Sequence, residues 1–212
     1  METEIEDTKA FYERYSNRWA ETHTNSFIHE EPFRLLLTLN NACRPKQKLK
    51  NRRLIDIGCA NGIHLPMFKR YARVMQYTGV DLSQTLVSLA REKYAEDTFF
   101  AGDISQIDTL PHGPFDTFWC AATLMHLPRE LMMHACHNIE RITRPRAFGY
   151  VTLPTAYPGK ERPAHDTRHY TIMSEEEQRE FFQNLSWEVR NMFTISGTKR
   201  AGVWRGWILQ RP

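Results

Sequence analysis

The 212-residue sequence lacks any apolar run near the ~20 residues that a membrane-spanning helix needs. Its four cysteines, Cys43, Cys59, Cys120 and Cys136, form no Cys-x-x-Cys pair, so we expect no zinc site and no other metal centre. The acidic start, residues 1–7, lacks the pattern of a secretory signal peptide. We therefore expect a cytoplasmic protein with reduced thiols and no membrane partner.

A strong excess of charge is also missing. The 28 Lys and Arg residues against 25 Asp and Glu give a net charge of +3 and a pI near 8.7, which does not demand nucleic acid. Residues 44–53 hold six cations and no acid, but they lack the interleaved aromatics that single-stranded RNA binding uses. We interpret this stretch as a solvated connector, with a phosphate-binding patch as the alternative.

The informative stretch is residues 54–65. Leu54 to Ile57 is a short apolar run typical of a buried parallel strand, and Gly58 and Gly62 then bracket a turn before a predicted helix. Such a turn lets a ligand approach the backbone closely, beside the free N–H groups of a helix N-terminus. A dinucleotide or S-adenosylmethionine (SAM) would suit it.

Further strands are predicted to end near Val80, near Gly102 and at Ala121. Asp56, Asp81 and Asp103 would then lie at one sheet edge, where ligands of open α/β sheets bind. The 25 residues from Asp56 to Asp81 (81 − 56) are close to the ~20 expected before an acidic residue that binds a ribose.

Taken in order, these elements resemble the class I SAM-dependent methyltransferases, especially the small single-domain (type 11/12/25-like) kind. Residues 56–62 resemble the family's Asp-x-Gly-x-Gly-x-Gly turn, with Ala60 in place of the middle glycine. Residues 80–83 resemble the ribose-binding strand end, 102–104 the adenine-contacting element, and 116–128 the fourth strand and its loop.

The resemblance implies an α/β, Rossmann-like fold: a doubly wound, mostly parallel seven-stranded sheet with an antiparallel C-terminal hairpin and N-terminal cap helices. We expect one domain over 1–212, with cap helices in 1–45, the core in 46–212 and a lid loop over 154–174. Helices are predicted at 5–24, 27–42, 65–72, 83–94, 129–143 and from Ser174, where Glu177 completes a capping box. The last strands are predicted at 147–153, 187–195 and 202–209.

The resemblance also implies a cofactor site. Asp81 would accept the ribose hydroxyls, Leu82 and Ile104 would sandwich the adenine, and Asp103 would accept from its amine. The complete predicted set is Tyr15, Trp19, Asp56, Gly58, Cys59, Ala60, Gly62, Asp81, Leu82, Gly102, Asp103, Ile104 and Ala121.

The acceptor side is predicted around His126, in the loop after the fourth strand. His126 is a general base by residue type, or a structural residue. The predicted substrate-binding residues are Tyr12, His126, Tyr157, Arg168 and Tyr170, with Arg168 either binding an anion or supporting the lid. The N-terminal helix and the lid are expected to close together over the cofactor.

The predicted activity is SAM-dependent methyl transfer (EC 2.1.1.-) to a nitrogen or oxygen of a small molecule, by a monomer or homodimer. A nicotinamide enzyme would prefer Gly-x-Gly-x-x-Gly at the turn. Residues 121–126 lack the Asn/Asp-Pro-Pro-Tyr motif of enzymes that alkylate base amines, and Cys120 lacks the preceding proline of C5-cytosine enzymes. A methyltransferase of tRNA or protein, or a catalytically silent SAM-binding protein, stays open.

Overall fold

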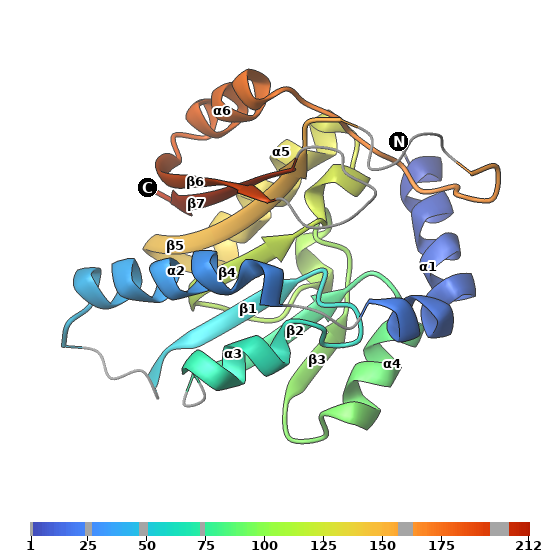
Figure 1. The fold of residues 1–212 in the computed structure, drawn as a ribbon, viewed down its shortest axis with the longest axis horizontal. Coiled ribbons are helices and arrows are strands. Elements are labelled where there is room, and N and C mark those ends of the chain that lie inside the picture. Colours follow the sequence, from blue (N-terminus) through green and yellow to red (C-terminus); the bar gives the residue numbers. More distant parts are fainter. Residues whose placement is uncertain (1, 24–26, 47–50, 73–74, 157–162, 196–203) are drawn as a thin grey trace.

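A computed structural model describes residues 2–23, 27–46, 51–72, 75–156, 163–195 and 204–212. It contains a seven-stranded sheet in the order β3-β2-β1-β4-β5-β7-β6 (Figure 1). The strands are β1 (Arg53–Ile57), β2 (Gln76–Asp81), β3 (Thr98–Ala101), β4 (Phe115–Ala121), β5 (Thr143–Pro154), β6 (Glu188–Ile195) and β7 (Trp204–Gln210).

The first five strands pair in parallel, and β7 runs antiparallel between β5 and β6. The predicted fold class is therefore confirmed. Parallel pairing places the carboxyl ends of β1, β2, β3 and β4 at one edge of the sheet, and Asp56 lies directly beside Trp119 across the β1–β4 pair. The residues that follow these strand ends form the candidate site.

Helices cover both faces of the sheet (Figure 1). Apolar side chains of α2 and α3 pack on one face against Leu54 and Trp119, and those of α5 and α6 pack on the other against Ile55 and Phe118. Alternating strand residues therefore supply two separate cores. The helices are α1 (Glu2–Thr22), α2 (Glu30–Cys43), α3 (Leu65–Ala72), α4 (Gln84–Lys93), α5 (Arg129–Ile142) and α6 (Glu175–Asn184), with short 3₁₀ turns η1 (Phe27–His29), η3 (Ile107–Thr109) and η4 (Leu124–His126).

Two predicted helix starts are confirmed by their caps. The Ser83 side chain accepts a hydrogen bond from Leu86 N at the start of α4. Ser174 and Glu177 form a reciprocal capping box at the start of α6. The four cysteines are free thiols, three of them buried.

Strand β5 begins earlier than the sequence suggested, at Thr143 rather than Ala147. Arg146 lies inside β5, where the pairing with β4 shifts register, and it adopts a left-handed conformation with φ of 59°. Its N–H donates to Pro212 O at 3.1 Å, so a contact with Pro212 holds a conformation that glycine favours.

The basic stretch 44–53 is not simply a solvated connector, and that interpretation is wrong at three positions. Arg52 is buried and donates to Asn41 Oδ1 at 2.6 Å and to Arg44 O at 2.7 Å. Arg44 in turn donates to backbone oxygens of Asp116 and Pro145, and Arg53 to that of His112. These guanidinium groups join α2 to the amino ends of the strands; residues 47–50 lie outside the described part.

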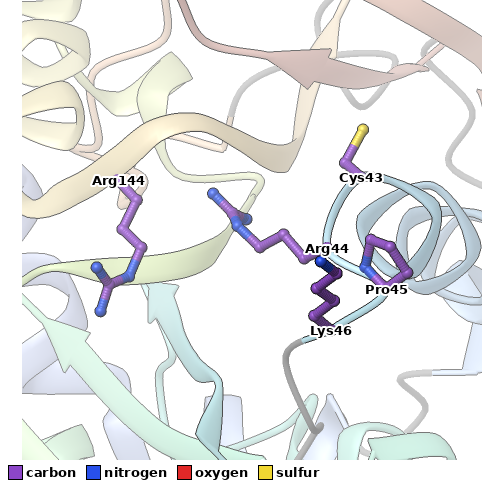
Figure 2. Close-up of a pocket in the computed structure, with 5 residues that line it drawn as sticks. All are labelled: Cys43, Arg44, Pro45, Lys46 and Arg144. Carbon is purple, nitrogen blue, oxygen red and sulfur yellow. The ribbon is translucent and has the colours of Figure 1, made fainter.

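An open hollow lies at this amino end, lined by Cys43, Arg44, Pro45, Lys46 and Arg144 (Figure 2). Arg144 is already paired with buried Asp116, with Nε and Oδ1 3.0 Å apart. The hollow therefore lies at the opposite sheet edge from the glycine turn. Among the described helices, none combines the length and apolarity needed to cross a bilayer.

Candidate active site

The turn after β1 has the backbone conformation that glycine favours. Gly58, Ala60 and Gly62 have φ angles of +71°, +49° and +75°. A Cβ atom on Gly58 would overlap the Thr123 side chain, and one on Gly62 would approach the Tyr94 ring to 2.8 Å. Gly58 N donates to Val80 O at 2.8 Å, which fixes the turn against β2.

Asp81 lies where β2 meets this turn. Its carboxylate accepts from Ala60 N at 2.8 Å and from Ser83 N at 2.9 Å, so it joins the turn to the start of α4. Burial raises the pKa of Asp81 to about 6, and these hydrogen bonds offset only part of that effect. The carboxylate is half-buried and retains acceptor capacity.

Asp56 is completely buried behind the turn. Its Oδ2 accepts from the Tyr77 hydroxyl at 3.1 Å. Burial raises the pKa of Asp56 to about 8 and lowers that of His64, whose Nδ1 lies 3.8 Å from Asp56 Oδ1, well below its usual value. Both side chains are therefore neutral near pH 7, and the short separation is not an ion pair.

Several buried polar atoms near the turn lack a protein partner among the described residues. They are Asp56 Oδ1, Asn61 Oδ1, His64 Nδ1 and Trp119 Nε1. The His64 and Trp119 ring centroids are 5.7 Å apart, and Trp119 neighbours Asp56 in the sheet. Buried polar groups are almost always hydrogen-bonded. Two carboxyl or amide oxygens with an indole N–H suit the ammonium and carboxylate groups of an amino acid.

Residues 102–104, predicted to contact the adenine, follow β3. Asp103 Oδ1 accepts from Ser105 N at 2.8 Å and from Ser105 Oγ at 2.7 Å, which shapes the loop around the half-buried aspartate. Ile104 is buried, Leu82 and Gly102 are half-buried, and Cys59 and Ala121 are buried. The structure thus brings these predicted cofactor residues to one edge.

His126 lies in η4, directly after β4. Its Nδ1 is 2.8 Å from His169 O, and its Nε2 is 2.9 Å from the Tyr12 hydroxyl. Burial lowers the pKa of His126 to about 4, so the imidazole is neutral near pH 7. The neutral imidazole has one ring-nitrogen lone pair that can accept a proton, and burial makes it a weaker base than a free histidine.

Residues 2–22 of α1 and residues 163–173 of the lid lie side by side, and we call them the roof (Figure 1). Both segments contact His126, through Tyr12 and His169. His169 N donates to Thr8 Oγ1 at 2.9 Å, and Thr167 Oγ1 donates to Asp7 O at 3.2 Å. On the core side, Thr171 N donates to Met125 O at 2.7 Å. The two segments are therefore bonded to each other as well as to the core.

Arg168 supports this roof. Its guanidinium pairs with both carboxylate oxygens of Asp166, each at 2.8 Å, and it packs 4.4 Å from the Phe11 ring centroid. Burial acts to lower the pKa of Arg168, but the bonds to Asp166 outweigh it and the pKa is raised. Because the guanidinium of Arg168 is already paired with Asp166, this geometry fits a role in supporting the lid better than a role in binding an anion.

The remaining aromatic candidates differ in position. Tyr15 contacts Phe11 and His165, with centroid distances of 4.7 and 5.8 Å, whereas Trp19 stacks on His23 at 4.4 Å. Tyr170 packs on His126 with a centroid distance of 5.0 Å. Tyr157 lies outside the described residues.

Comparison with known proteins gives the family. A family model described as a methyltransferase domain matches residues 55–151, which contain the glycine turn, Asp81, Asp103 and His126. The chain belongs to the class I SAM-dependent methyltransferases. A search of curated proteins found no match.

Solved structures show the same fold as this methyltransferase. A magnesium protoporphyrin IX methyltransferase from Synechocystis PCC 6803 with bound SAM has a TM-score of 0.69 at 16% identity, covering 99% of this chain and 97% of that one. An amino pentose methyltransferase from Micromonospora echinaspora, also with SAM, gives 0.62 at 16%, covering 92% and 96%. A [4+2]-cyclase, SpnF, gives 0.61 at 18%, covering 82% and 80%.

The candidate site of this methyltransferase also includes buried polar residues that sequence patterns did not single out. Asn61, His64 and Trp119 carry unpartnered atoms beside Asp56, and His29 Nδ1 lies 3.1 Å from the Tyr150 hydroxyl in the same buried cluster. Asn61 and His64 adjoin the glycine turn in sequence, which was a usable signal. Trp119 and His29 read as ordinary core residues, so nothing in their local pattern distinguished them.

Proposed function

We propose that this methyltransferase transfers the SAM methyl group to a nitrogen or oxygen of a small molecule, with residues 1–212 acting as one domain. The observation that carries the small-molecule assignment is the roof, which bonds directly onto His126 and leaves only 8% of that residue exposed. An acceptor that fits under such a cover is compact. The relatives above that act on a tetrapyrrole and an amino sugar support this class.

In this proposal, the unpartnered atoms beside the turn bind the amino-acid end of SAM. Asp56 Oδ1 and Asn61 Oδ1 would accept from its ammonium, and Trp119 Nε1 would donate to its carboxylate. Gly58, Cys59, Ala60 and Gly62 would pass along it, and Asp81 would accept from the ribose hydroxyls. Leu82, Gly102, Asp103, Ile104 and Ala121 would surround the adenine, while Tyr15 and Trp19 would close the site from α1.

The bound cofactor supplies an activated methyl group on a sulfonium. The chain's contribution is to hold the acceptor in line with that group, to exclude water with the roof and to take up the acceptor's proton at His126. Tyr12, Tyr170 and Arg168 lie around His126 and would position the acceptor.

The cofactor part is tested by titrating SAM calorimetrically into Asp81 variants. We expect Asp81→Ala to weaken binding by about 1.5–3 kcal/mol, the usual effect of losing hydrogen bonds to a charged group. Asp81→Asn, which keeps one acceptor oxygen, is expected to lose less. Asp108→Ala, an exposed aspartate in η3, is the control and keeps wild-type affinity. Unchanged affinity in a folded Asp81→Ala protein contradicts the proposed site.

The acceptor class is tested by following conversion of SAM to S-adenosylhomocysteine (SAH) with fractionated extract. Turnover confined to the low-molecular-weight fraction supports a small molecule. Turnover that requires the tRNA or protein fraction contradicts it. The basic hollow in Figure 2 is relevant here, and we expect no tRNA complex that weakens steeply with salt.

A catalytically silent SAM-binding protein is the second candidate. The observation that favours it is that SpnF, a protein of similar fold, is named as a [4+2]-cyclase and not as a methyltransferase. It predicts normal SAM affinity with no SAH formed in any fraction. The two functions are therefore separated by the same extract experiment.

A further inference from the structure

Five groups from three parts of the chain form a continuous hydrogen-bonded row at His126. Asp166 pairs with Arg168, and Arg168 Nη1 lies 3.2 Å from the Tyr12 hydroxyl. Tyr12 is 2.9 Å from His126 Nε2, and His126 Nδ1 is 2.8 Å from His169 O. Asp166 and His126 are buried, with 7% and 8% of their surface exposed.

The chemistry of the two ends fixes the direction of every bond between them. The His169 carbonyl can only accept, so His126 Nδ1 carries the ring proton and Nε2 of the neutral imidazole is a lone pair. A guanidinium can only donate, so the Tyr12 oxygen accepts from Arg168. Tyr12 has one proton, and it therefore points to His126 Nε2.

This arrangement leaves no direct route from His126 to an acceptor. The single lone pair of Nε2 is taken by the Tyr12 hydroxyl, while the Tyr12 oxygen keeps one lone pair after accepting from Arg168. Tyr12 lies in the part of α1 that faces the cofactor edge, because its neighbour Glu13 accepts a hydrogen bond from Gln84 N, three residues after Asp81.

We infer that Tyr12 is the catalytic residue that meets the acceptor, and that it relays the acceptor's proton to His126. The inference rests on the proposed methyl transfer. The acceptor's X–H bond breaks and its proton goes to the Tyr12 oxygen, while the Tyr12 proton passes to His126 Nε2. The electron pair of X forms the bond to the methyl carbon, and the carbon–sulfur bond breaks with its electrons on sulfur.

The balance of charge explains the other members of the row. The positive charge of the sulfonium ends on the His126 imidazolium, which the His169 carbonyl holds through Nδ1 and which later returns its proton to solvent. Arg168 stabilises any negative charge that develops on the Tyr12 oxygen during the transfer, and Asp166 keeps Arg168 in place. Tyr170 packs on the imidazole and hydrogen-bonds to Asp166 at 3.3 Å.

The first test needs no acceptor. Protein with ¹⁵N-labelled histidine, saturated with SAH, is titrated with acid by NMR, and His126 is assigned by its loss in His126→Gln. We expect an unprotonated Nε2 whose shift changes in Tyr12→Phe. Because the Tyr12 proton stabilises the neutral ring, Tyr12→Phe should also raise the pKa of His126. A protonated Nε2, or a lowered His126 pKa in Tyr12→Phe, overturns the relay.

The second test uses the first compound turned over in a panel of phenols, carboxylic acids and amines. Tyr12→Phe and His126→Gln should each lower kcat by about 10²–10⁴-fold, the usual range for lost acid–base catalysis, and the double variant should be no worse than either single one. Ser16→Ala is the control, because it removes a different hydroxyl of α1 that bonds only to the Glu13 backbone in the described residues. SAH affinity and thermal unfolding check that each variant is folded.

Separate results identify separate failures. If wild-type protein binds SAM but converts no panel or extract acceptor, the proposed function fails, and the relay is judged by the NMR titration. If wild-type protein is active and Tyr12→Phe loses less than about threefold while His126→Gln loses 10²-fold or more, Tyr12 only holds the roof and the inference is wrong.

Discussion

At the scale of single residues, Ala60 is one position where this chain departs from the pattern of its family. Its φ of 49° lies in the left-handed region, where a Cβ costs about 1–2 kcal/mol. Replacing alanine by glycine removes this strain but lowers stability by about 0.4–1 kcal/mol, because glycine gives the unfolded chain more conformational entropy. We therefore expect Ala60→Gly to raise the free energy of unfolding by up to about 1 kcal/mol, measured by urea denaturation.

The control for that prediction is Ala10→Gly, at an exposed position inside α1. There the backbone is helical, and glycine is expected to cost about 1 kcal/mol instead. Equal losses for both variants would show that Ala60 is not strained.

Asp56 gives a second prediction at this scale. The pKa of Asp56 is raised from 3.8 to about 8, so in the free protein its carboxyl is protonated at pH 7. The contribution of Asp56 to the stability of the free protein should accordingly fall as the pH rises through this window, because the unfolded chain releases that proton more easily. A bound ammonium at Oδ1 would favour the carboxylate, and SAM binding should then release up to about one proton at pH 7.

Calorimetry in buffers of different ionisation enthalpy measures that proton release. Asp56→Asn should abolish it and flatten the dependence of stability on pH. Binding enthalpies that do not vary with the buffer would show that Asp56 remains neutral in the complex.

Among the secondary-structure elements, α1 is joined to the start of α4 by the side chain of Glu13. Both carboxylate oxygens of Glu13 accept from the start of α4, from Gln84 N at 2.7 Å and Thr85 N at 3.1 Å. Burial acts to raise the pKa of Glu13, but these bonds and that of the Thr85 hydroxyl outweigh it and the pKa is lowered. Glu13 thus caps α4 from another helix.

We expect Glu13→Ala to lower the free energy of unfolding by about 0.5–2 kcal/mol, the usual effect of losing a helix cap. The same variant should speed amide hydrogen exchange throughout α1. Glu21→Ala, at an exposed site of the same helix, should change neither. Unchanged exchange in α1 of Glu13→Ala would mean that the contacts of this helix with the lid and with His126 hold it without Glu13.

The order and type of these elements could be predicted from local patterns, because apolar alternation, caps and glycine turns are written in adjacent residues. Ser83 and Ser174 were placed correctly as caps for this reason. Contacts between distant segments were not readable in the same way. Arg52 looked like part of a charged connector because its partners Asn41 and Arg44 come from the preceding helix and its end.

The same distinction between local patterns and long-range contacts applies to the residues of the candidate site. Asp56, Asp81 and Asp103 could be found because strand ends follow from the pattern. The bond from Tyr12 to His126 joins residues 114 positions apart, and the unpartnered atom of Trp119 depends on what packs around it. Only the assembled fold supplies that information.

At the scale of the whole molecule, the roof should respond to ligand as one unit. SAH is expected to protect residues 2–22 and 163–173 from hydrogen exchange together with the turns after Ile57 and Asp81, because the two roof segments are bonded to each other. Protection confined to the turns, with the roof unchanged, would place the acceptor pocket elsewhere.

The bonds between α1 and the lid also bear on the timing of catalysis. Because neither segment can leave His126 without breaking its bonds to the other, cofactor and acceptor would be exchanged through a single opening event in each turnover. Departure of SAH and of the methylated product would then share one slow step. Turnover at saturation would be governed by how fast this cover lifts, and it would slow in a viscous medium even though the chemical step is unaffected.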